Sequence, residues 1–470
     1  MRLFERELTQ TATDGRIGPL NDLRRLIGEQ LHDGQTPIRF AVTKSSRHSF
    51  RYEIGILEGV ESIGPSMFDL QPRQDDDASA FNAVLVVPTG IGAEIGGHAG
   101  DATPVARLLA AVCDTLITHP NVVNASDLNE MPRNGLYVEG SLLSRFLMGT
   151  IGLRPVRSNR VLVIIDAHPK ERFARATVNA VNAARATYGL RCPRVVVLDP
   201  PLPVHGEYTQ SGRAAGTVED LERVFEVLDT HRGEYDAVAL STLVDVDVPH
   251  ESYFSSRGEV VNPWGGVEAM LTHAISTLYN VPSAHAPMME STEVANIDPG
   301  VVDPRMAAEV ISLTFLQSVL KGLHTAPRIA VGPTETASLS PAGGEIQRGG
   351  HTVTTQPHTL TVRDVSCLVI PDGCIGLPTL AALEQGIPVI AVRENRSLMR
   401  NDLSLLPWAS DQLHVVENYW EAAGVMAALK EGISPGSVRR PLRDVRIERT
   451  LSREGSRSGM STSRPGVAEQ

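Results

Sequence analysis

Short β-branched runs alternate with helical stretches along most of this chain, and this alternation constrains the fold more than any other feature. The predicted strands lie at 83–87, 114–118, 160–166, 194–199, 235–241, 280–286, 327–331, 366–370 and 387–392. The segments between them carry the spacing of amphipathic helices, at 103–113, 170–188, 218–230, 267–278, 304–323 and 378–385. Strands separated by helices favour a parallel sheet that helices cover on both faces. The sequence therefore predicts a Rossmann-like α/β fold, built as one large sheet or as two halves.

The chain divides into three predicted parts. Residues 1–75 form a small N-terminal α+β unit, and its helix and two strands are expected at 19–32, 38–44 and 50–59. Residues 76–433 form the Rossmann-like body, in which 332–357 is rich in Gly, Pro, Ser and Thr and predicts a long loop or short hairpin. Residues 434–470 are rich in Arg, Ser and Gly, which is typical of a disordered tail.

Composition excludes several classes of protein. The 470 residues carry 43 basic and 55 acidic side chains, and a net charge of −12 disfavours binding to nucleic acid. No apolar run reaches the roughly 18 residues of a membrane span, and the first residues lack a signal peptide's apolar core. Four cysteines without CxxC spacing exclude a disulfide scaffold and a zinc ribbon. We therefore expect a cytoplasmic protein without a membrane or nucleic-acid partner, and a homo-oligomer stays open.

The loop at 88–104, after the first strand of the body, is the first candidate ligand site. Ligands of parallel sheets bind at the carboxyl ends of the strands, and five glycines here allow backbone N–H groups to approach an anion. The loop matches neither a Walker A motif nor GxGxxG. Its substrate-binding candidates are Thr89, Gly90, Gly92, Glu94, Gly96, Gly97 and His98, and Asp101 is a catalytic candidate. A glycine-rich turn without a ligand is the alternative.

Three other strand ends finish in a histidine close to a proline, at His119, His168 and His285. Neutral imidazole serves in acid–base catalysis and as a metal ligand, so we expect a catalytic or metal-binding cluster. Glu290 is the fourth candidate ligand for a divalent metal, but no HExxH-like spacing supports the metal. The expected carboxylate partners are Asp101, Asp166, Glu290 and Asp372. Each histidine alone is more often a hydrogen-bonded turn residue.

Further substrate-binding candidates lie near other strand ends and helix starts. Two loop–helix–strand units, at 262–282 and 372–393, place glycine at a helix start, where bare N–H groups suit phosphate or carboxylate. Tight helix–sheet packing is the alternative for both units, and a structural ion pair is the alternative for Glu139 and Arg145. The candidates are Asn121, Asn124, Ser126, Glu139, Ser141, Arg145, Gly265, Gly266, Glu268, Gly373, Gly376, Thr379 and Arg393.

Cys374 is the one cysteine in a setting that suits a nucleophile, because a helix N-terminus lowers a thiol pKa. Buried packing is the commoner role for a lone cysteine. The chain has only four lysines and no phosphate cup to support pyridoxal phosphate. No acidic residue follows a GxGxxG fingerprint at the spacing that NAD requires. The cofactor is left unknown, with a divalent metal as one alternative.

Six phrases of the chain are distinctive when taken together: PTGIGAEIGGHAGDATP, THPNVVNAS, YVEGSLLSRFL, PWGGVEAMLTHAI, AHAPMME and DGCIGLPTLAALEQGIPVIAVREN. They resemble a family of hypothetical α/β proteins that is classed only as a domain of unknown function. The resemblance covers about Asn82 to Arg396 and implies a shared fold and site, but no reaction.

The last phrase also resembles the nucleotide-diphosphate loop of GT-B-type sugar epimerases and glycosyltransferases. Cys374-Ile375 and Leu377-Pro378 stand where those enzymes have glycines and glutamates. Nucleotide-sugar binding, as in a GT-B-like transferase or epimerase, is therefore the runner-up function.

We expect an enzyme, a hydrolase, lyase or isomerase, that acts on a small anionic metabolite at the carboxyl edge of the sheet. Acid–base or metal-assisted chemistry would come from the histidines and their carboxylate partners. Backbone N–H groups at two or three helix starts would hold the anion. A rival is a non-catalytic protein that binds a small ligand through the glycine loops and does not need the histidines.

Overall fold

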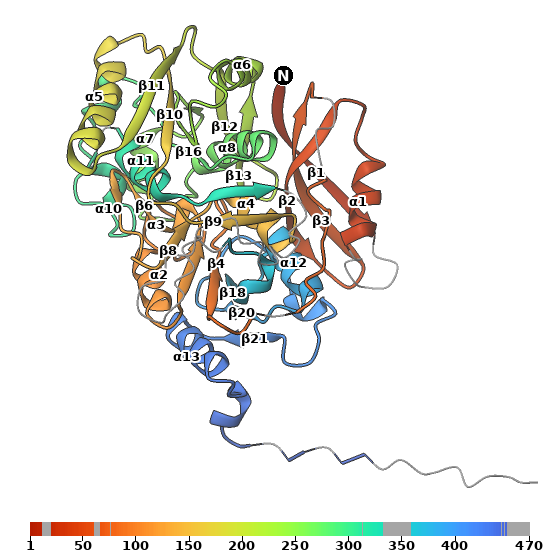
Figure 1. The fold of residues 1–470 in the computed structure, drawn as a ribbon. Helices are drawn as coiled ribbons and strands as arrows, with labels where there is room; N and C mark the ends of the chain where they lie inside the picture. The colour runs from red at the N-terminus through yellow and green to blue at the C-terminus, as the bar shows by residue number, and fades with distance from the viewer. Residues whose placement is uncertain are drawn as a thin grey trace, which may run out of the picture.

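Two all-parallel sheets and one mixed sheet are the main sheets of the described residues, with helices packed around them and two small two-stranded sheets beside them (Figure 1). The computed structural model describes residues 1–11, 20–60, 66–75, 77–312, 314–331, 359–442, 444–445 and 447–448. The α/β class with Rossmann-like parallel sheets is confirmed. Since the parallel strands fall into two separate sheets, the body has two halves and not one large sheet.

The larger parallel sheet lies in the lower part of Figure 1 and has six strands. Their order is β21 (Leu413–Val416), β20 (Val389–Val392), β18 (Val365–Pro371), β4 (Asn82–Leu85), β5 (Thr115–Thr118) and β8 (Gly135–Tyr137). Its associated helices are α2 (Thr103–Ala110), α4 (Gly140–Leu147), α12 (Leu377–Gln385) and α13 (Tyr419–Lys430). Every residue of β4 and β20 is buried, as β-branched and apolar strands covered on both faces require.

The smaller parallel sheet has four strands. Their order is β11 (Arg191–Leu198), β10 (Arg160–Asp166), β14 (Ala237–Ser241) and β16 (Ser283–His285). Its associated helices are α5 (Glu171–Tyr188), α6 (Glu222–Thr230), α8 (Gly265–Tyr279) and α11 (Leu316–Thr325). Helix α11 packs on β14 and β16 and also contacts β8, so it joins the two parallel sheets.

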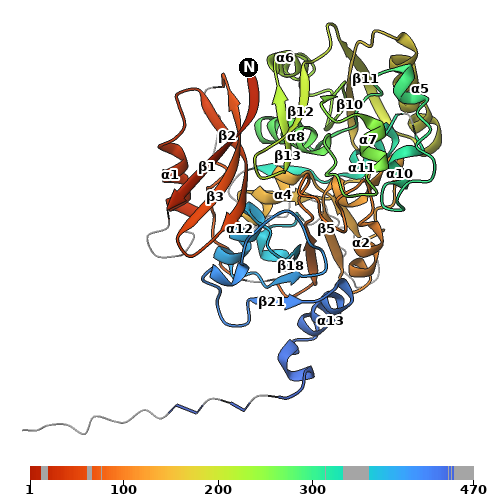
Figure 2. The ribbon, with the colours of Figure 1, turned by 180° about the vertical axis from the view of Figure 1, so that it is seen from behind.

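The mixed sheet combines the N-terminal strands with strands of the body, as the red and green strands in Figures 1 and 2 show. Its order is β15 (Asp245–Val246), β12 (Val204–Tyr208), β13 (Ala214–Val218), β1 (Arg2–Thr11), β3 (Ser49–Glu58), β2 (Gln35–Ser45) and β19 (Ile375–Gly376). Helix α1 (Leu20–Gly28) precedes β2, near the helix expected at 19–32. The segment 1–75 therefore shares one sheet with three later segments of the chain.

Two details of the predicted body are wrong. The strand predicted at 327–331 is β17 (Arg328–Val331), but it pairs antiparallel with β9 (Ile151–Arg154) outside the parallel sheets. The single helix predicted at 304–323 is two helices, α10 (Ala307–Val310) and α11, and Phe315, the N-cap of α11, has a left-handed φ of 52° that a continuous helix does not allow.

Parts of two other predictions lie outside the described residues. The loop or hairpin expected at 332–357 lies entirely outside the described residues, and so does the whole of the tail after residue 448. The described start of the tail contains the short 3-10 helix η3 (Pro435–Val438). The remaining short elements are β6 (Asn124–Ala125), β7 (Leu128–Asn129), α3 (Pro120–Val123), α7 (His250–Ser255), α9 (Thr292–Ala295), η1 (Val362–Asp364) and η2 (Leu403–Leu405).

Helix α8 packs between the mixed sheet and β16 of the smaller parallel sheet. This close approach requires glycine, since a Cβ on Gly266 would lie 2.2 Å from the carbonyl carbon and oxygen of Ala214. We expect Gly266→Ala to lower the free energy of unfolding by about 1–3 kcal/mol through overpacking, measured by urea denaturation.

Gly424→Ala is the matched control for this prediction. Gly424 lies inside α13, and nothing lies within 4 Å of the position that its Cβ would take. Alanine there is expected to raise the free energy of unfolding by about 0.5–1 kcal/mol, because it favours the helix. Equal effects of the two substitutions would contradict the packing argument.

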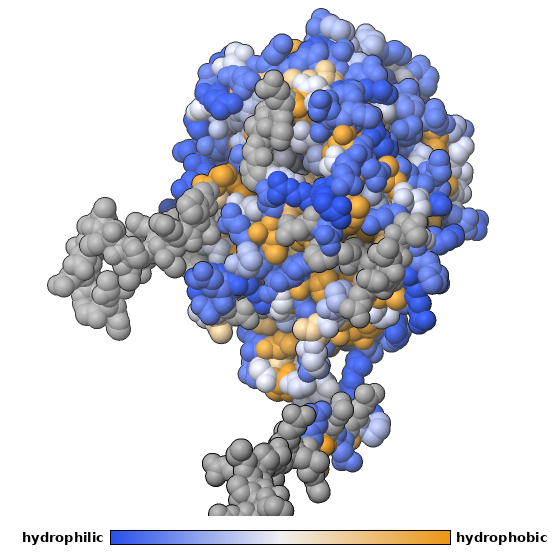
Figure 3. Space-filling view, turned by 90° about the vertical axis from the view of Figure 1, so that its right-hand side faces the viewer, coloured by the Kyte–Doolittle hydropathy of each residue, from blue (hydrophilic) through white to orange (hydrophobic). Residues whose placement is uncertain are grey.

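The face drawn in Figure 3 carries hydrophilic side chains over most of its coloured surface, with hydrophobic side chains in several separate groups. This mixture is ordinary for the surface of a folded chain. Among the helices that the structure describes, none is long and apolar enough to cross a membrane.

Candidate functional site

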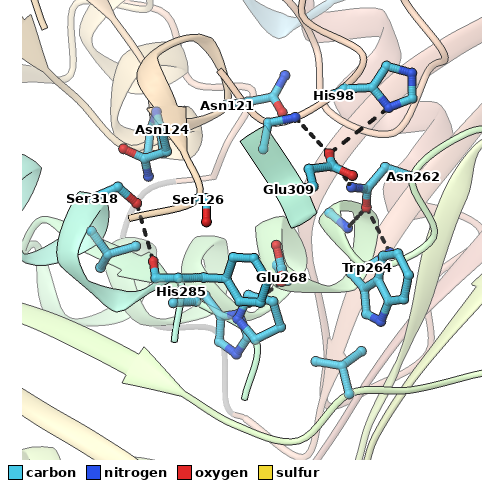
Figure 4. Close-up of a pocket in the computed structure, with 18 of the residues that line it drawn as sticks. His98, Asn121, Asn124, Ser126, Asn262, Trp264, Glu268, His285, Glu309 and Ser318 are labelled. Carbon is cyan, nitrogen blue, oxygen red and sulfur yellow. Dashed lines mark hydrogen bonds and ion pairs between the residues drawn. The ribbon is translucent and has the colours of Figure 1, made fainter. Parts of the chain in front are cut away.

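The carboxyl ends of the two parallel sheets open onto one cavity of about 280 Å³. Its walls include residues of the loops after β4, β5, β8, β14 and β16, of α8 and of the start of α11. Figure 4 shows His98, Glu309 and Asn262 on one side of this cavity and Asn124 and Ser126 on the other. Because parallel sheets bind ligands at this edge, the cavity is the candidate functional site.

Helix α8 presents a polar face to the cavity. Glu268, Thr272 and His273 line it. Glu268 and Thr272 are four residues apart, as are Ala269 and His273, and this spacing makes each pair neighbours on the helix surface. Gly265 and Ala269 line the cavity from the same helix, and their small side chains leave room for a ligand beside the polar groups.

His273 and Glu139 form a closely paired acid–base group in this wall. His273 Nδ1 is hydrogen-bonded to Glu139 Oε1. Glu139 is the N-cap of α4, and its Oε2 accepts from the N–H groups of Ser141 at 2.9 Å and Leu142 at 3.2 Å. With Nδ1 committed to the carboxylate, Nε2 is the ring nitrogen that can take up or release a substrate proton.

The surroundings of Glu139 keep it ionised. Burial alone would raise the pKa of its carboxyl group, but the neighbouring His273 and the hydrogen bonds from His273 and Ser141 outweigh burial, so the pKa is lowered. An ionised carboxylate fixes the orientation of the imidazole and stabilises its charged form, which is the arrangement of a general base with its orienting partner.

His285 lies between two polar groups at the end of β16. Its Nε2 is 2.8 Å from Thr242 Oγ1, and its Nδ1 is 3.3 Å from Glu268 Oε1. The second contact is an ion-pair distance without hydrogen-bond alignment, so both atoms lack a hydrogen-bond partner. Glu268 therefore keeps an unused acceptor beside the cavity.

A second network, around Glu309 of α10, ties three wall segments together. Glu309 Oε2 accepts from the Tyr253 hydroxyl at 2.7 Å, and Oε1 accepts from Ala99 N–H at 2.8 Å and Asn262 Nδ2 at 3.2 Å. The Tyr253 proton goes to Glu309, so His98 Nδ1–H, 3.0 Å away, donates to the tyrosine oxygen. Burial lowers the pKa of His98, so its ring is neutral in this network.

Ser126 is a strained residue in the cavity wall. Its φ of 52° lies in the left-handed region that favours glycine, and its buried hydroxyl has no hydrogen-bond partner. Strain of this kind in a side chain with an unused hydrogen-bonding group is typical of a functional position.

His119 is held as a neutral ring. Its Nε2 accepts from Val87 N–H at 3.1 Å, so Nδ1 carries the proton. Burial lowers the pKa of His119 to about 4, while nearby Glu139 opposes this shift and His273 adds to it. His119 is thus a hydrogen-bond donor, and not a cation, at neutral pH.

The pKa of His119 predicts a loss of stability in acid. The unfolded chain takes up this proton near pH 6.5, whereas the folded chain resists it until about pH 4. As pH falls from 6.5 to 4, the unfolded state is therefore favoured, by about 1.4 kcal/mol per pKa unit and about 3 kcal/mol in all. Wild type should lose this much relative to His119→Gln in urea denaturation between pH 7 and pH 4.

The matched control is His48→Gln, which changes an exposed histidine at the turn between β2 and β3. Its free energy of unfolding should run parallel to that of wild type over the same pH range. A constant difference between wild type and His119→Gln from pH 7 to pH 4 would contradict the buried neutral ring.

Many of the sequence-predicted site residues are brought together around the cavity. Those that line it are Thr89, Gly90, Gly97, His98, His119, Asn121, Asn124, Ser126, Glu139, Gly265, Glu268, His285 and Glu290. Burial raises the pKa of the Glu290 carboxyl, with Asp245 as a further cause. Part of the glycine-rich loop and two of the three strand-end histidines, His119 and His285, thus line one cavity.

Other predicted residues line neither this cavity nor the smaller one described below. They are Gly92, Glu94, Gly96, Asp101, Asp166, His168, Gly266, Asp372, Gly373, Thr379 and Arg393. Several have structural partners instead. Arg393 contacts Glu417 at 2.7 Å and lies 3.9 Å from Asp372 at the surface.

Asp101, Asp166 and His168 are occupied by backbone groups. Asp101 accepts from Gly96 N–H at 2.7 Å, and burial raises its pKa to about 7. Asp166 accepts from two backbone N–H groups at 2.9 and 2.8 Å, and burial raises its pKa to about 6. His168 Nδ1 accepts from Lys170 N–H, and its Nε2 lies 2.9 Å from Met289 O. These contacts hold turns in place.

Cys374 is buried, and burial raises the pKa of its thiol to about 12, so the group stays protonated at neutral pH. A protonated, buried thiol is a poor nucleophile. Within the part of the chain that the structure describes, no three His, Cys, Asp or Glu side chains are grouped to hold a metal ion. His119 and His285 point their Nε2 atoms at Val87 and Thr242 rather than at a shared centre.

A smaller cavity of about 140 Å³ adjoins the first. Its walls contain Ser141, Arg145, Cys374 and Gly376, and also residues of β2. The two cavities share the wall residues Thr89, His119, Gly140, Ala269 and His273. The His273–Glu139 pair therefore stands where the two cavities meet.

Sequence reasoning missed several residues of the site, among them His273, Tyr253, Asn262 and Glu309. His273 lies inside a helix and not at a strand end, and only its spacing from Gly265 and Ala269 along α8 could have indicated it. Tyr253, Asn262 and Glu309 depend on contacts between distant segments, for which the sequence has no local signal. Glu309 lies 210 positions from its partner Ala99.

The fold and the cavity define an α/β protein with a histidine- and carboxylate-lined pocket at the carboxyl edge of two parallel sheets. Residues 82–439 match DUF3326, a family described as proteins of unknown function, and the chain belongs to that family. It is also 34% identical over 364 residues to an uncharacterized lipoprotein of Synechococcus sp.. That similarity covers 76% of this chain and 93% of the relative.

Proposed function

We propose that this protein is an enzyme that acts on a small anionic metabolite by acid–base chemistry, as a hydrolase, lyase or isomerase. The observation that carries the proposal is the His273–Glu139 pair, in which an ionised, buried carboxylate orients an imidazole at the wall of a cavity. A binding protein has no need for such an oriented base, whereas proton transfer depends on it.

In this proposal, each group has a separate task. His273 Nε2 takes up a substrate proton, and Glu139 stabilises the imidazolium that results. Glu268, whose Oε1 has no hydrogen-bond partner, accepts a hydrogen bond from a hydroxyl or amino group of the substrate. His119, neutral with Nδ1–H, donates a hydrogen bond to developing negative charge.

The test is a search for proton transfer. Purified protein would be incubated in D₂O with a panel of small hydroxy-, amino- and keto-carboxylates and sugar phosphates, followed by ¹H NMR. We expect at least one compound to exchange a C–H proton or to form a product, at a rate that His273→Gln abolishes and His48→Gln does not change. Binding without exchange or turnover across the panel would overturn the proposal in favour of the non-catalytic alternative.

Thermal unfolding of the same protein preparation distinguishes the proposed function from the nucleotide-sugar alternative. Protection against heat unfolding by uridine diphosphate, and not by the small carboxylates, would favour that alternative.

The expected location also has a direct test, since a relative is named a lipoprotein. We keep the cytoplasmic location as our proposal, and recovery of the native protein in the membrane fraction would contradict it.

A further inference from the structure

Arg145 lies in the smaller cavity as a buried cation, and no carboxylate among the described residues forms an ion pair with it. The residue is only 8% exposed and lines the cavity from α4. Its Nη1 is buried without a hydrogen-bond partner. Burial lowers the pKa of the guanidinium, although nearby Glu139 opposes this effect. A buried charge is normally paired and hydrogen-bonded, because leaving it unpaired is costly.

The other two arginines of this cavity have partners. Arg213 contacts Glu53 at 2.6 Å and also pairs with Glu5, and Arg39 lies 3.7 Å from Glu5. Arg39 also donates to the carbonyl oxygens of Thr89 and Gly266. Two cations thus face two carboxylates, so the guanidinium of Arg145 is the group left to meet an incoming anion.

The start of α12 adds a second anion-binding element to the same cavity. Its N-cap, Gly376, and the first helical residues Leu377 and Pro378 line the cavity, and no side chain caps this nine-residue helix. Pro378 has no N–H, so the other N–H groups of the first turn are the ones that lack a side-chain cap. The start of α4 differs, because Glu139 already accepts from its first N–H groups. Arg145 and the start of α12 therefore converge on one small space.

We propose that this cavity binds the carboxylate of the substrate, with Arg145 as the residue that contacts it. The inference rests on the proposed function, and it narrows the substrate to a small carboxylic acid whose reacting atom lies beside His273. One unpaired guanidinium balances one negative charge, which fits a carboxylate better than a phosphate dianion. Apolar residues such as Ile38, Phe40 and Leu143 form much of the remaining wall and disfavour a larger charge.

The larger cavity indicates the other end of this acid. Glu268, Glu290 and Glu309 line it, and its walls contain no lysine or arginine among the residues described. A second anionic group would be repelled there, whereas a hydroxyl or amino group can donate to these carboxylates. The substrate class is therefore a hydroxy- or amino-carboxylate that spans both cavities.

Thermal unfolding at constant ionic strength tests the carboxylate site, with acetate, glycolate and glycine as probes and acetamide as the neutral control. We expect the melting temperature of wild type to rise saturably with the carboxylates and not with acetamide. Arg145→Met should abolish this rise, and Arg107→Met, which changes an exposed arginine on α2, should keep it. Arg145→Met should also unfold at a higher temperature than wild type without ligand, because it removes an unpaired buried charge.

Two results would overturn the inference. One is an equal rise of the melting temperature, or no rise, in wild type and Arg145→Met up to 100 mM carboxylate. That concentration is roughly ten times a dissociation constant of about 10 mM, which is already weak binding. The other is a larger rise with inorganic phosphate than with any carboxylate. Failure of the proposed function is distinguishable, because it would leave carboxylate binding at Arg145 intact with no turnover. Turnover with a KM that Arg145→Met does not change would leave the enzyme proposal intact and remove this site.

Discussion

Replacing His273 with glutamine is expected to lower kcat about 10²–10⁴-fold with the substrate that the NMR panel identifies. The expectation follows from the position of His273 between the two cavities and from its hydrogen bond to Glu139. Glu139→Gln should cause a comparable loss, because an amide cannot stabilise the imidazolium as a carboxylate does. The double variant should be little worse than either single one, since the pair acts as a unit.

The measurement is kcat and KM as a function of pH, with urea denaturation to show that each variant folds. The glutamine of Glu139→Gln retains an oxygen that can accept from the first N–H groups of α4, so the helix cap is preserved. The limb of the pH profile that belongs to the base should vanish in His273→Gln and persist in His48→Gln. An unchanged kcat in His273→Gln would exclude this residue as the base.

Replacing Arg213 with methionine is expected to lower the free energy of unfolding by about 3–5 kcal/mol. Arg213 is almost fully buried and hydrogen-bonded to Glu53 and Glu5, which are buried as well. Its guanidinium lowers the pKa of Glu53 against the opposing effect of burial. Without the guanidinium, two carboxylates remain in the interior with only Arg39 close to one of them.

Urea denaturation checks this prediction, and the loss should be smaller at pH 5 than at pH 7. Protonation removes the charge of the stranded Glu53 carboxylate, whose pKa is no longer lowered once the Arg213 guanidinium is gone. Adding Glu53→Gln to Arg213→Met should recover part of the stability, whereas Arg107→Met should cost little because its side chain is exposed. A loss below about 1 kcal/mol in Arg213→Met would place this cluster with ordinary surface ion pairs.

Local patterns were sufficient for most of the parallel strands and several of their helices, but β8 and β21 were not predicted. β10 and α5 match their predicted ranges closely, because a buried β-branched run followed by an amphipathic helix carries its own signal. β1 was missed for a physical reason. It contains Glu5, which is buried only because Arg213, 208 positions away, arrives to pair with it. No local pattern can reveal a partner at that distance.

Only part of the site was predicted, because some of its residues also depend on contacts between distant segments. The rule that ligands bind at the carboxyl ends of parallel strands located the glycine-rich loop, His119 and His285. The two histidines and part of the loop line the cavity, whereas His168, selected by the same rule, does not. It could not locate His273, which lies inside α8, or distinguish Glu139 as an orienting group from a structural ion-pair partner. The catalytic roles of these residues stay predictions until a substrate is known.

The wall of the smaller cavity has two separate origins along the chain. Arg145, His273 and the start of α12 belong to the part that matches the family, whereas Ile38 and Phe40 come from β2, before residue 82 where the match begins. Substitutions in β2 can therefore resize the smaller cavity without touching the His273–Glu139 pair. Under the proposed function, the residues that set the size of the substrate would thus lie on a different segment from the residues proposed to transfer the proton.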